Sequence, residues 1–208
     1  AMHLFAGSSH PALALALARE LGCTRGKVKL KAFSCGERYV RYEETIRGKD
    51  VYILQTGTAH PNEDMMELFI MLDSFKRSFA AKVHVVMPYF PYARQDRVAS
   101  PREPISAKVI ADLLVAAGAD HIVTVQLHAD QAQAFFDVPV DNLNAKKLFA
   151  DYFNGKKLSD VVVVSPDAGG AKNAKQFADR LGAPIAILHK TRPEHNVSVV
   201  THVVGDVK

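Results

Sequence analysis

The stretch SAKVIADLLVAAGADHIVTV, residues 106–125, indicates the fold of this chain. Its first part predicts a helix over 106–117, because apolar residues recur at the spacing that places them on one face of a helix. Gly118 follows where helices commonly end, and the β-branched run 121–125 predicts a strand. The predicted buried stripe of this helix consists of Val109, Ile110, Leu113, Leu114 and Ala117.

The same alternation of helix and strand continues on both sides of this stretch. Longer segments with helical periodicity separate short β-branched runs, and this order is typical of a parallel sheet covered by helices. We therefore expect an α/β fold with parallel sheets flanked by helices. The predicted strands lie at 51–56, 82–87, 121–125, 161–164 and 184–188.

A second helix is predicted over 62–80. Asn62 is its expected N-cap, and the carboxylates of Glu63 and Asp64 in the first turn oppose the positive end of the helix dipole. The regular spacing of its large apolar residues predicts that they belong to the core. These residues are Met65, Leu68, Phe69, Leu72, Phe75 and Phe79.

Composition excludes several classes of protein. Of the 208 residues, 48% are hydrophobic and 23% are charged, which supplies a core and excludes a disordered chain. The net charge of +4 comes from scattered cations, so we expect no nucleic-acid partner. Cys23 and Cys35 are too far apart for a CxxC pair and too few for a disulfide framework. With no basic leader and no long apolar run, we expect a cytoplasmic protein without a membrane partner.

The sequence predicts two domains, 1–142 and 143–208. Residues 141–144 form the expected junction, because a new helical pattern starts at residue 145 and leads into the strand at 161–164. The second segment is short for a doubly wound domain. We therefore expect the first domain to be complete and the second to be cut short.

Polar residues follow two predicted strands, at the edge where open parallel sheets bind ligands. After the strand at 161–164, Gly169 and Gly170 allow main-chain N–H groups to approach an anion, and Asp167 could hold a hard cation such as Mg²⁺. A tight turn with Asp167 as a helix cap is equally compatible with this pattern. His128 follows the strand at 121–125, where it is a candidate metal contact or an ordinary structural histidine.

Two further segments carry cations. The non-periodic stretch 88–104 combines tyrosines with Arg94, Arg97 and Arg102, which suits stacking of a base and clamping of phosphates, although a solvated loop is the alternative. Lys190 and Arg192 follow the strand at 184–188, where they could stabilise charge on a transferred phosphoryl group. Neither the Walker nor the dinucleotide glycine pattern follows a predicted strand.

Taken together, these segments resemble the ribose-phosphate pyrophosphokinases. The resemblance implies two phosphoribosyltransferase-like domains, with 1–142 as the ATP-side domain and 143–208 as the first part of the second. It also implies Mg²⁺-dependent transfer of the β,γ-pyrophosphoryl group of ATP to the 1-hydroxyl of ribose 5-phosphate, which releases AMP. The family forms oligomers with ATP between subunits, so we expect a homo-oligomer, a hexamer as in the family or a dimer. The matching blocks include FSCGE at 33–37, PYFPYARQDR at 88–97, LHA at 127–129 and SPDAGG at 165–170.

The resemblance also assigns roles to individual residues. The ATP-binding set is Phe33, Cys35, Gly36, Glu37, Arg94 and Gln95. The Mg²⁺ contacts are His128 and Asp167, the catalytic residues are Lys190 and Arg192, and Arg192 also contacts the ribose phosphate.

The chain departs from the family pattern in three places. Cys35 stands where Asn or Asp is usual, which removes an acceptor for the adenine amino group, and Gln126 stands where Asp commonly precedes Leu-His. The glycine-rich loop that cradles the ribose phosphate in the family would follow residue 208, so we expect this chain to bind adenine nucleotide weakly and to be inactive. The alternatives are a non-catalytic regulatory subunit, against which the retained site residues argue, and a phosphoribosyltransferase, in which the Arg94–Gln95 loop has no role.

Overall fold

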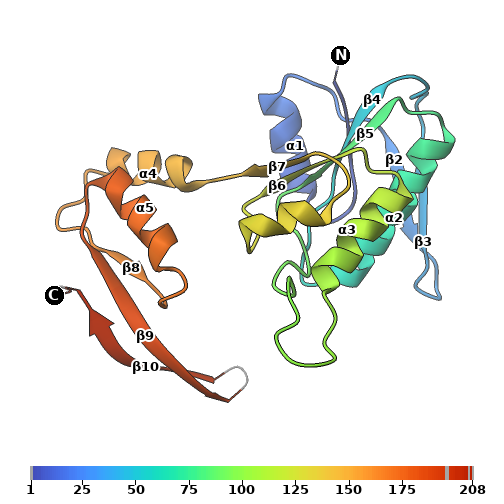
Figure 1. The fold of residues 1–208 in the computed structure, drawn as a ribbon. Coiled ribbons are helices and arrows are strands. Elements are labelled where there is room, and N and C mark those ends of the chain that lie inside the picture. Colours follow the sequence, from blue (N-terminus) through green and yellow to red (C-terminus); the bar gives the residue numbers. More distant parts are fainter. Residues whose placement is uncertain (1, 195–196, 206, 208) are drawn as a thin grey trace. The chain divides into compact units, whose positions relative to one another are not determined.

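The computed structural model describes residues 2–194, 197–205 and 207, with the side chains of 190–199 and 201 also left aside. The chain divides into two compact units, Ala1–Leu143 and Asn144–Lys208. This division lies next to the junction expected from the sequence. Each unit is described by itself (Figure 1).

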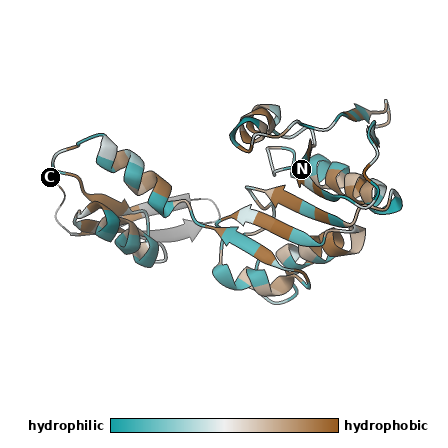
Figure 2. Ribbon diagram, turned by 90° about the horizontal axis from the view of Figure 1, so that it is seen from above, coloured by the Kyte–Doolittle hydropathy of each residue, from teal (hydrophilic) through white to brown (hydrophobic). Residues whose placement is uncertain are grey.

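A five-stranded parallel sheet forms the centre of the first unit, with the strand order β1-β4-β5-β6-β7. The predicted α/β class is confirmed, and the predicted strands at 82–87 and 121–125 have the predicted bounds. Figure 2 shows hydrophobic residues along much of these strands, as expected for a sheet that is covered by helices. The strands are β1 (His3–Ala6), β4 (Asp50–Leu54), β5 (Lys82–Met87), β6 (His121–Val125) and β7 (Val140–Leu143).

Helices cover both faces of this sheet. On one face, α2 (Pro61–Arg77) and α3 (Ser106–Ala117) pack in the main core, together with a 3₁₀ helix, η1 (Asp130–Phe135). On the other face, α1 (Pro11–Glu20) packs against β1 and β4 through a smaller cluster of buried residues. Those residues are Leu4, Ala6, Ala14, Ala18 and Leu54.

Helix α3 has the bounds predicted for it and ends at Gly118, but its predicted stripe was partly wrong. Val109 is 51% exposed and Leu113 is 45% exposed. The helix instead presents Ala107, Ile110, Ala111 and Leu114 to the core. The buried face thus includes two small alanines, and the larger Val109 and Leu113 lie on the exposed side.

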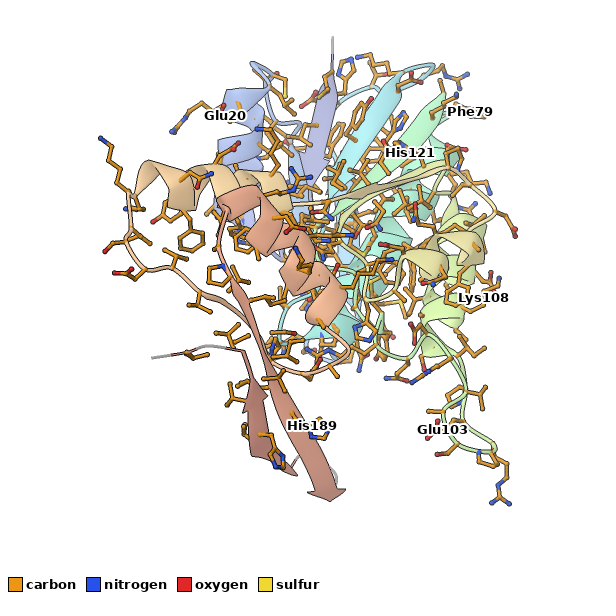
Figure 3. All side chains as sticks on the ribbon, turned by 60° about the vertical axis from the view of Figure 1, so that its left-hand side comes forward. Glu20, Phe79, Glu103, Lys108, His121 and His189 are labelled. Atoms are coloured by element: carbon orange, nitrogen blue, oxygen red, sulfur yellow. The ribbon has the colours of Figure 1, made fainter. Side chains whose placement is uncertain are left out.

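Helix α2 differs from its prediction at both ends. His60, not Asn62, is the N-cap, because Pro61 occupies the first helical position, where its missing N–H costs nothing. The helix ends at Arg77, so Phe79 lies beyond it with φ of 60° and is 61% exposed. Its ring lies at the periphery (Figure 3), where the Arg47 guanidinium covers it at 4.3 Å.

An antiparallel hairpin, which the sequence did not predict, packs against α2. It consists of β2 (Val28–Ala32) and β3 (Arg38–Tyr42). The ring of Tyr42 stacks on Phe75 with 4.8 Å between centroids, and the edge of Phe5 meets the same Phe75 ring at 4.9 Å. Phe75 is fully buried, so this aromatic cluster joins the hairpin, α2 and β1.

A buried carboxylate holds four distant segments together. Glu67 of α2 is only 1% exposed, and it accepts hydrogen bonds from the N–H of Ser8 at 2.7 Å, the hydroxyl of Ser8 at 3.0 Å and the amide of Gln55 at 3.0 Å. The Arg38 guanidinium of the hairpin lies 3.8 Å from it. These partners satisfy a charge whose burial would otherwise be costly.

The second unit contains a three-stranded sheet in the order β10-β9-β8. Strands β8 and β9 are parallel, whereas β9 and β10 are antiparallel. Among the described residues, no helix is long and apolar enough to span a membrane. The elements are α4 (Lys146–Gly155), β8 (Val163–Ser165), α5 (Ala171–Leu181), β9 (Ile185–Glu194) and β10 (Val197–Val204).

Candidate functional site

The tip of the β2–β3 hairpin carries the predicted adenine-contacting residues. The N–H of Phe33 donates to the carbonyl of Glu37 at 2.8 Å, and the N–H of Gly36 donates to the carbonyl of Phe33 at 2.9 Å. Gly36 has φ of 92°, a conformation that side chains disfavour, so this tight turn favours glycine there. The Phe33 ring is 51% exposed, and Cys35 is an exposed free thiol. An exposed ring at this position is available to stack on a base.

The turn after β5 presents the predicted ATP-binding pair. Gln95 is fixed to the start of α3, because its carbonyl accepts from the N–H of Ala107 at 3.1 Å and its side chain accepts from the Ser106 hydroxyl. Its N–H donates to the carbonyl of Tyr92 at 2.9 Å. Arg94, immediately before it, is exposed. These hydrogen bonds fix the backbone next to Arg94 and thus the point from which its guanidinium extends.

The His128 loop after β6 is anchored by β7. The side-chain carbonyl of Asn142 accepts from the N–H of Leu127 at 2.9 Å, while its amide donates to the Asp130 carboxylate at 3.0 Å. Gln126 at the start of the loop has φ of 53°, which turns the chain away from the sheet. His128 itself is exposed. One side chain of β7 therefore fixes both ends of a short segment that carries His128.

Arg94 and His128 line one hollow of about 470 Å³ in the first unit. Two predicted site residues from separate loops are therefore brought together. The guanidinium groups in this hollow can bind phosphate oxygens through two hydrogen bonds each. The other lining residues are Asp96, Arg97, Ala99, Ala129, Gln131, Ala132 and Phe135.

Asp167 of the second unit closes a turn that leads into α5, a helix without a side-chain cap. Its carboxylate accepts from the N–H of Gly170 at 2.8 Å, and Gly170 is the N-cap residue of α5. The hydroxyl of buried Ser165 donates to the Asp167 carbonyl at 2.7 Å. The turn that the sequence offered as one alternative for Asp167 is therefore present, and it leaves the side chain half-buried.

The predicted catalytic residues Lys190 and Arg192 belong to β9. Their side chains lie outside the part of the chain that the structure describes. Their predicted roles remain predictions.

The hollow offers few side chains that could bind a metal ion. No group of three or more His, Cys, Asp or Glu side chains that could hold a metal occurs among the described residues. Mg²⁺ usually keeps several waters and takes one or two carboxylates together with substrate phosphates. The Asp96 and His128 side chains of the hollow fit a cation that arrives on nucleotide phosphates, and they do not form a cage of their own.

The parallel sheet with polar loops at its carboxyl edge places the chain among α/β proteins that bind ligands at that edge. Residues 2–118 match the N-terminal domain of ribose phosphate pyrophosphokinase. The chain belongs to this family, and the resemblance seen in its sequence motifs is confirmed.

Named relatives agree with this assignment. The chain is 50% identical to the ribose-phosphate pyrophosphokinase of Clostridium perfringens over 208 residues and 49% identical to that of Bacillus caldolyticus over 206 residues. These matches cover 99% of the chain but only 65% of each relative. The crystal structure of phosphoribosylpyrophosphate synthetase from Mycobacterium smegmatis superimposes with a TM-score of 0.91 at 46% identity, covering 100% of this chain and 68% of that one.

Asn142 gives a first test of how the site is held. Asn142→Ala removes the acceptor of the Leu127 N–H, and we expect the amide hydrogen of Leu127 to exchange about tenfold faster, since an unmade hydrogen bond at a buried position costs about 1–3 kcal/mol. Hydrogen exchange followed by NMR measures this. Asn142→Asp keeps the acceptor and should protect Leu127 better than alanine does. Equal protection in Asn142→Ala and in the unmodified chain would contradict the anchoring role.

Proposed function

We propose that this chain is the ATP-binding part of a ribose-phosphate pyrophosphokinase, a transferase of diphosphate groups that acts in nucleotide biosynthesis. The enzyme would transfer the β,γ-pyrophosphoryl group of ATP to the 1-hydroxyl of ribose 5-phosphate and release AMP. The observation that carries the proposal is the convergence of Arg94 and His128 in one hollow, in a chain that belongs to this family.

The hairpin would bind the adenine of the nucleotide, and the hollow would bind its phosphates. Phe33 would stack on adenine, with Cys35, Gly36 and Glu37 completing the turn around it. The exposed ring of Phe33 supports this role. Arg94, beside the anchored Gln95, would bind the phosphates, because a guanidinium offers paired donors to phosphate oxygens. In the family, ATP lies between subunits, so we propose a homo-oligomer.

The reaction requires positively charged groups at defined positions, and it requires no nucleophile from the protein. In phosphoryl transfer the transition state is loose, so the protein mainly positions groups and stabilises negative charge. Lys190 and Arg192 would supply that positive charge, and Arg192 would also contact the ribose phosphate. Bound Mg²⁺ would neutralise phosphate charge, with His128 and Asp167 as its protein contacts.

The chain spans about 65% of the length of the named relatives. In the family pattern the loop that cradles the ribose phosphate follows the position of residue 208. We therefore expect residues 1–208 by themselves to bind ATP weakly and to form no product.

The test measures ATP binding by calorimetry and AMP formation from ATP, Mg²⁺ and ribose 5-phosphate. The full-length Clostridium perfringens relative is the positive control. We expect nucleotide binding without turnover by residues 1–208. Substantial AMP formation would overturn the expected inactivity, and absence of ATP binding would overturn the proposed nucleotide site. A change in the rate of an active relative upon mixing would instead favour a regulatory subunit.

A further inference from the structure

Two histidines on neighbouring strands of the first unit contact each other, away from the candidate site. His84 in β5 and His121 in β6 are directly paired in the parallel register. Their Nδ1 atoms lie 2.9 Å apart, and their rings are nearly perpendicular at 87°. His121 is the first residue of β6 (Figure 3), whereas His128 follows the last residue of that strand. The pair therefore lies at the opposite end of the strand from the candidate nucleotide site.

Neighbouring side chains fix the orientation of both rings. The Asp141 carboxylate of β7 lies 3.2 Å from Nε2 of His121, and the Tyr52 ring of β4 stacks on His84 with 4.4 Å between centroids. A carboxylate accepts the Nε2 proton, which leaves the Nδ1 lone pair of His121 directed at His84. We assign the single proton between the two Nδ1 atoms to His84, which donates it to His121.

Burial favours the neutral form of His84. Burial lowers the pKa of His84, and any positive charge on His121 and the charge of Lys82 act in the same direction, while Asp50 and Asp120 act in the opposite direction. Asp141 on β7 is the acidic neighbour of His121. At pH 7 His84 is therefore neutral, and neutral imidazole is the form that binds metal ions.

We propose that His84 and His121 form a binding site for a divalent transition-metal ion such as Zn²⁺, which replaces the proton between their Nδ1 atoms. Binding forms two Zn–N bonds, and the proton of His84 moves from Nδ1 to Nε2 by exchange with solvent, so that both ligands are neutral imidazoles. A tetrahedral Zn²⁺ with bonds of about 2.0–2.1 Å holds two nitrogens roughly 3.3 Å apart, so the rings need to separate by about 0.4 Å and to tilt until both lone pairs point at the ion, which lies off the line between the nitrogens.

The site provides two protein ligands, with water completing the coordination shell. Among the described side chains, no third His, Cys, Asp or Glu completes a metal-binding group. His121 retains 21% exposure of its side chain, so solvent reaches the pair. Asp141 is a positioning residue here, because it holds His121 in the tautomer whose Nδ1 is free to bind.

The experiment titrates Zn²⁺ into the chain at pH 7.5, with calorimetry and thermal unfolding as readouts. We expect one ion bound at the pair and a raised unfolding temperature, since a ligand that binds only the folded state stabilises it. His84→Ala and His121→Ala should each weaken this binding at least tenfold, and Asp141→Asn should weaken it about tenfold. Affinity should fall toward pH 5.5, because protons compete for both nitrogens.

A second histidine pair supplies the matched control. His189 and His202 face each other across β9 and β10 with ring centroids 6.4 Å apart. Replacing both with alanine should leave binding at the proposed site unchanged. Loss of that binding in this double variant, or its persistence in His84→Ala and His121→Ala, would overturn the proposal.

Nitrogen-15 NMR of the unmodified chain avoids any folding defect in the variants. Zn²⁺ should shift the Nδ1 resonances of His84 and His121 together. Shifts confined to other histidines, or no shift at millimolar Zn²⁺, would also overturn the proposal. None of these readouts depends on nucleotide binding or turnover, so this inference can fail while the proposed function stands.

Discussion

Replacing Arg94 with alanine is expected to weaken ATP binding by about 10- to 150-fold, the equivalent of losing hydrogen bonds to a charged group worth about 1.5–3 kcal/mol. The guanidinium lines the hollow that also holds His128, and its planar fork can bind two phosphate oxygens at once. Arg94→Lys keeps the charge but loses this fork, so its affinity should be intermediate. Calorimetric titration with ATP measures all three proteins.

Arg102 provides the control for this prediction. It is an exposed arginine of the same long loop and does not line the hollow. Arg102→Ala therefore removes one positive charge from the loop without removing a phosphate ligand. Equal loss of affinity in the two alanine variants would show that general charge attraction, and not a contact from Arg94, holds the nucleotide.

Replacing Phe75 with alanine is expected to lower the free energy of unfolding of the first unit by about 3–5 kcal/mol. The side chain is fully buried between Tyr42 and Phe5, so its removal leaves a cavity that three separate elements line. Chemical denaturation followed by circular dichroism gives the free energy.

Phe79→Ala is the matched variant, since the same ring is lost from a side chain that is 61% exposed. The change removes the contact with the Arg47 guanidinium from a mostly exposed side chain, and we expect a cost below about 1 kcal/mol. A similar decrease in the free energy of unfolding for Phe75→Ala and Phe79→Ala would contradict the stabilising role of the aromatic cluster.

The bounds of helix α3 could be predicted because local signals agreed. Strong apolar periodicity set its length and Gly118 ended it. Which residues it buries depended on its neighbours, because the alanines Ala107 and Ala111 fit against the core more closely than the larger Val109 and Leu113. Periodicity identifies a helix better than it identifies the orientation of that helix.

The hairpin and the Glu67 network could not be predicted in the same way. β2 alternates apolar residues with lysines over only five positions, β3 has no regular alternation, and the connection 33–37 is longer than a two-residue hairpin turn. The helix pattern predicts that Glu67 is an ordinary exposed acid. Its contacts with Ser8, Gln55 and Arg38 explain why it is buried instead. Such contacts join residues far apart in sequence, so local patterns carry no signal for them.

The candidate site was partly predictable for a topological reason. Arg94 and His128 follow the neighbouring strands β5 and β6, and the carboxyl ends of parallel strands share one edge of the sheet. The choice between cap and metal contact for Asp167 depended on the exact turn, which the residue pattern left open. The structure shows a turn in which Asp167 accepts from the N–H of Gly170, while α5 has no side-chain cap.

The position of β1 at the edge of the sheet has a consequence for synthesis on the ribosome. β1 is made well before β4, its partner in the sheet, in which Val51 pairs with His3. At about 5–20 residues per second, the ribosome makes that partner roughly 2–10 s later. During this interval Leu4 and Phe5, which end fully buried, have no sheet to join. The nascent chain therefore presents an apolar segment that a chaperone can hold until β4 emerges.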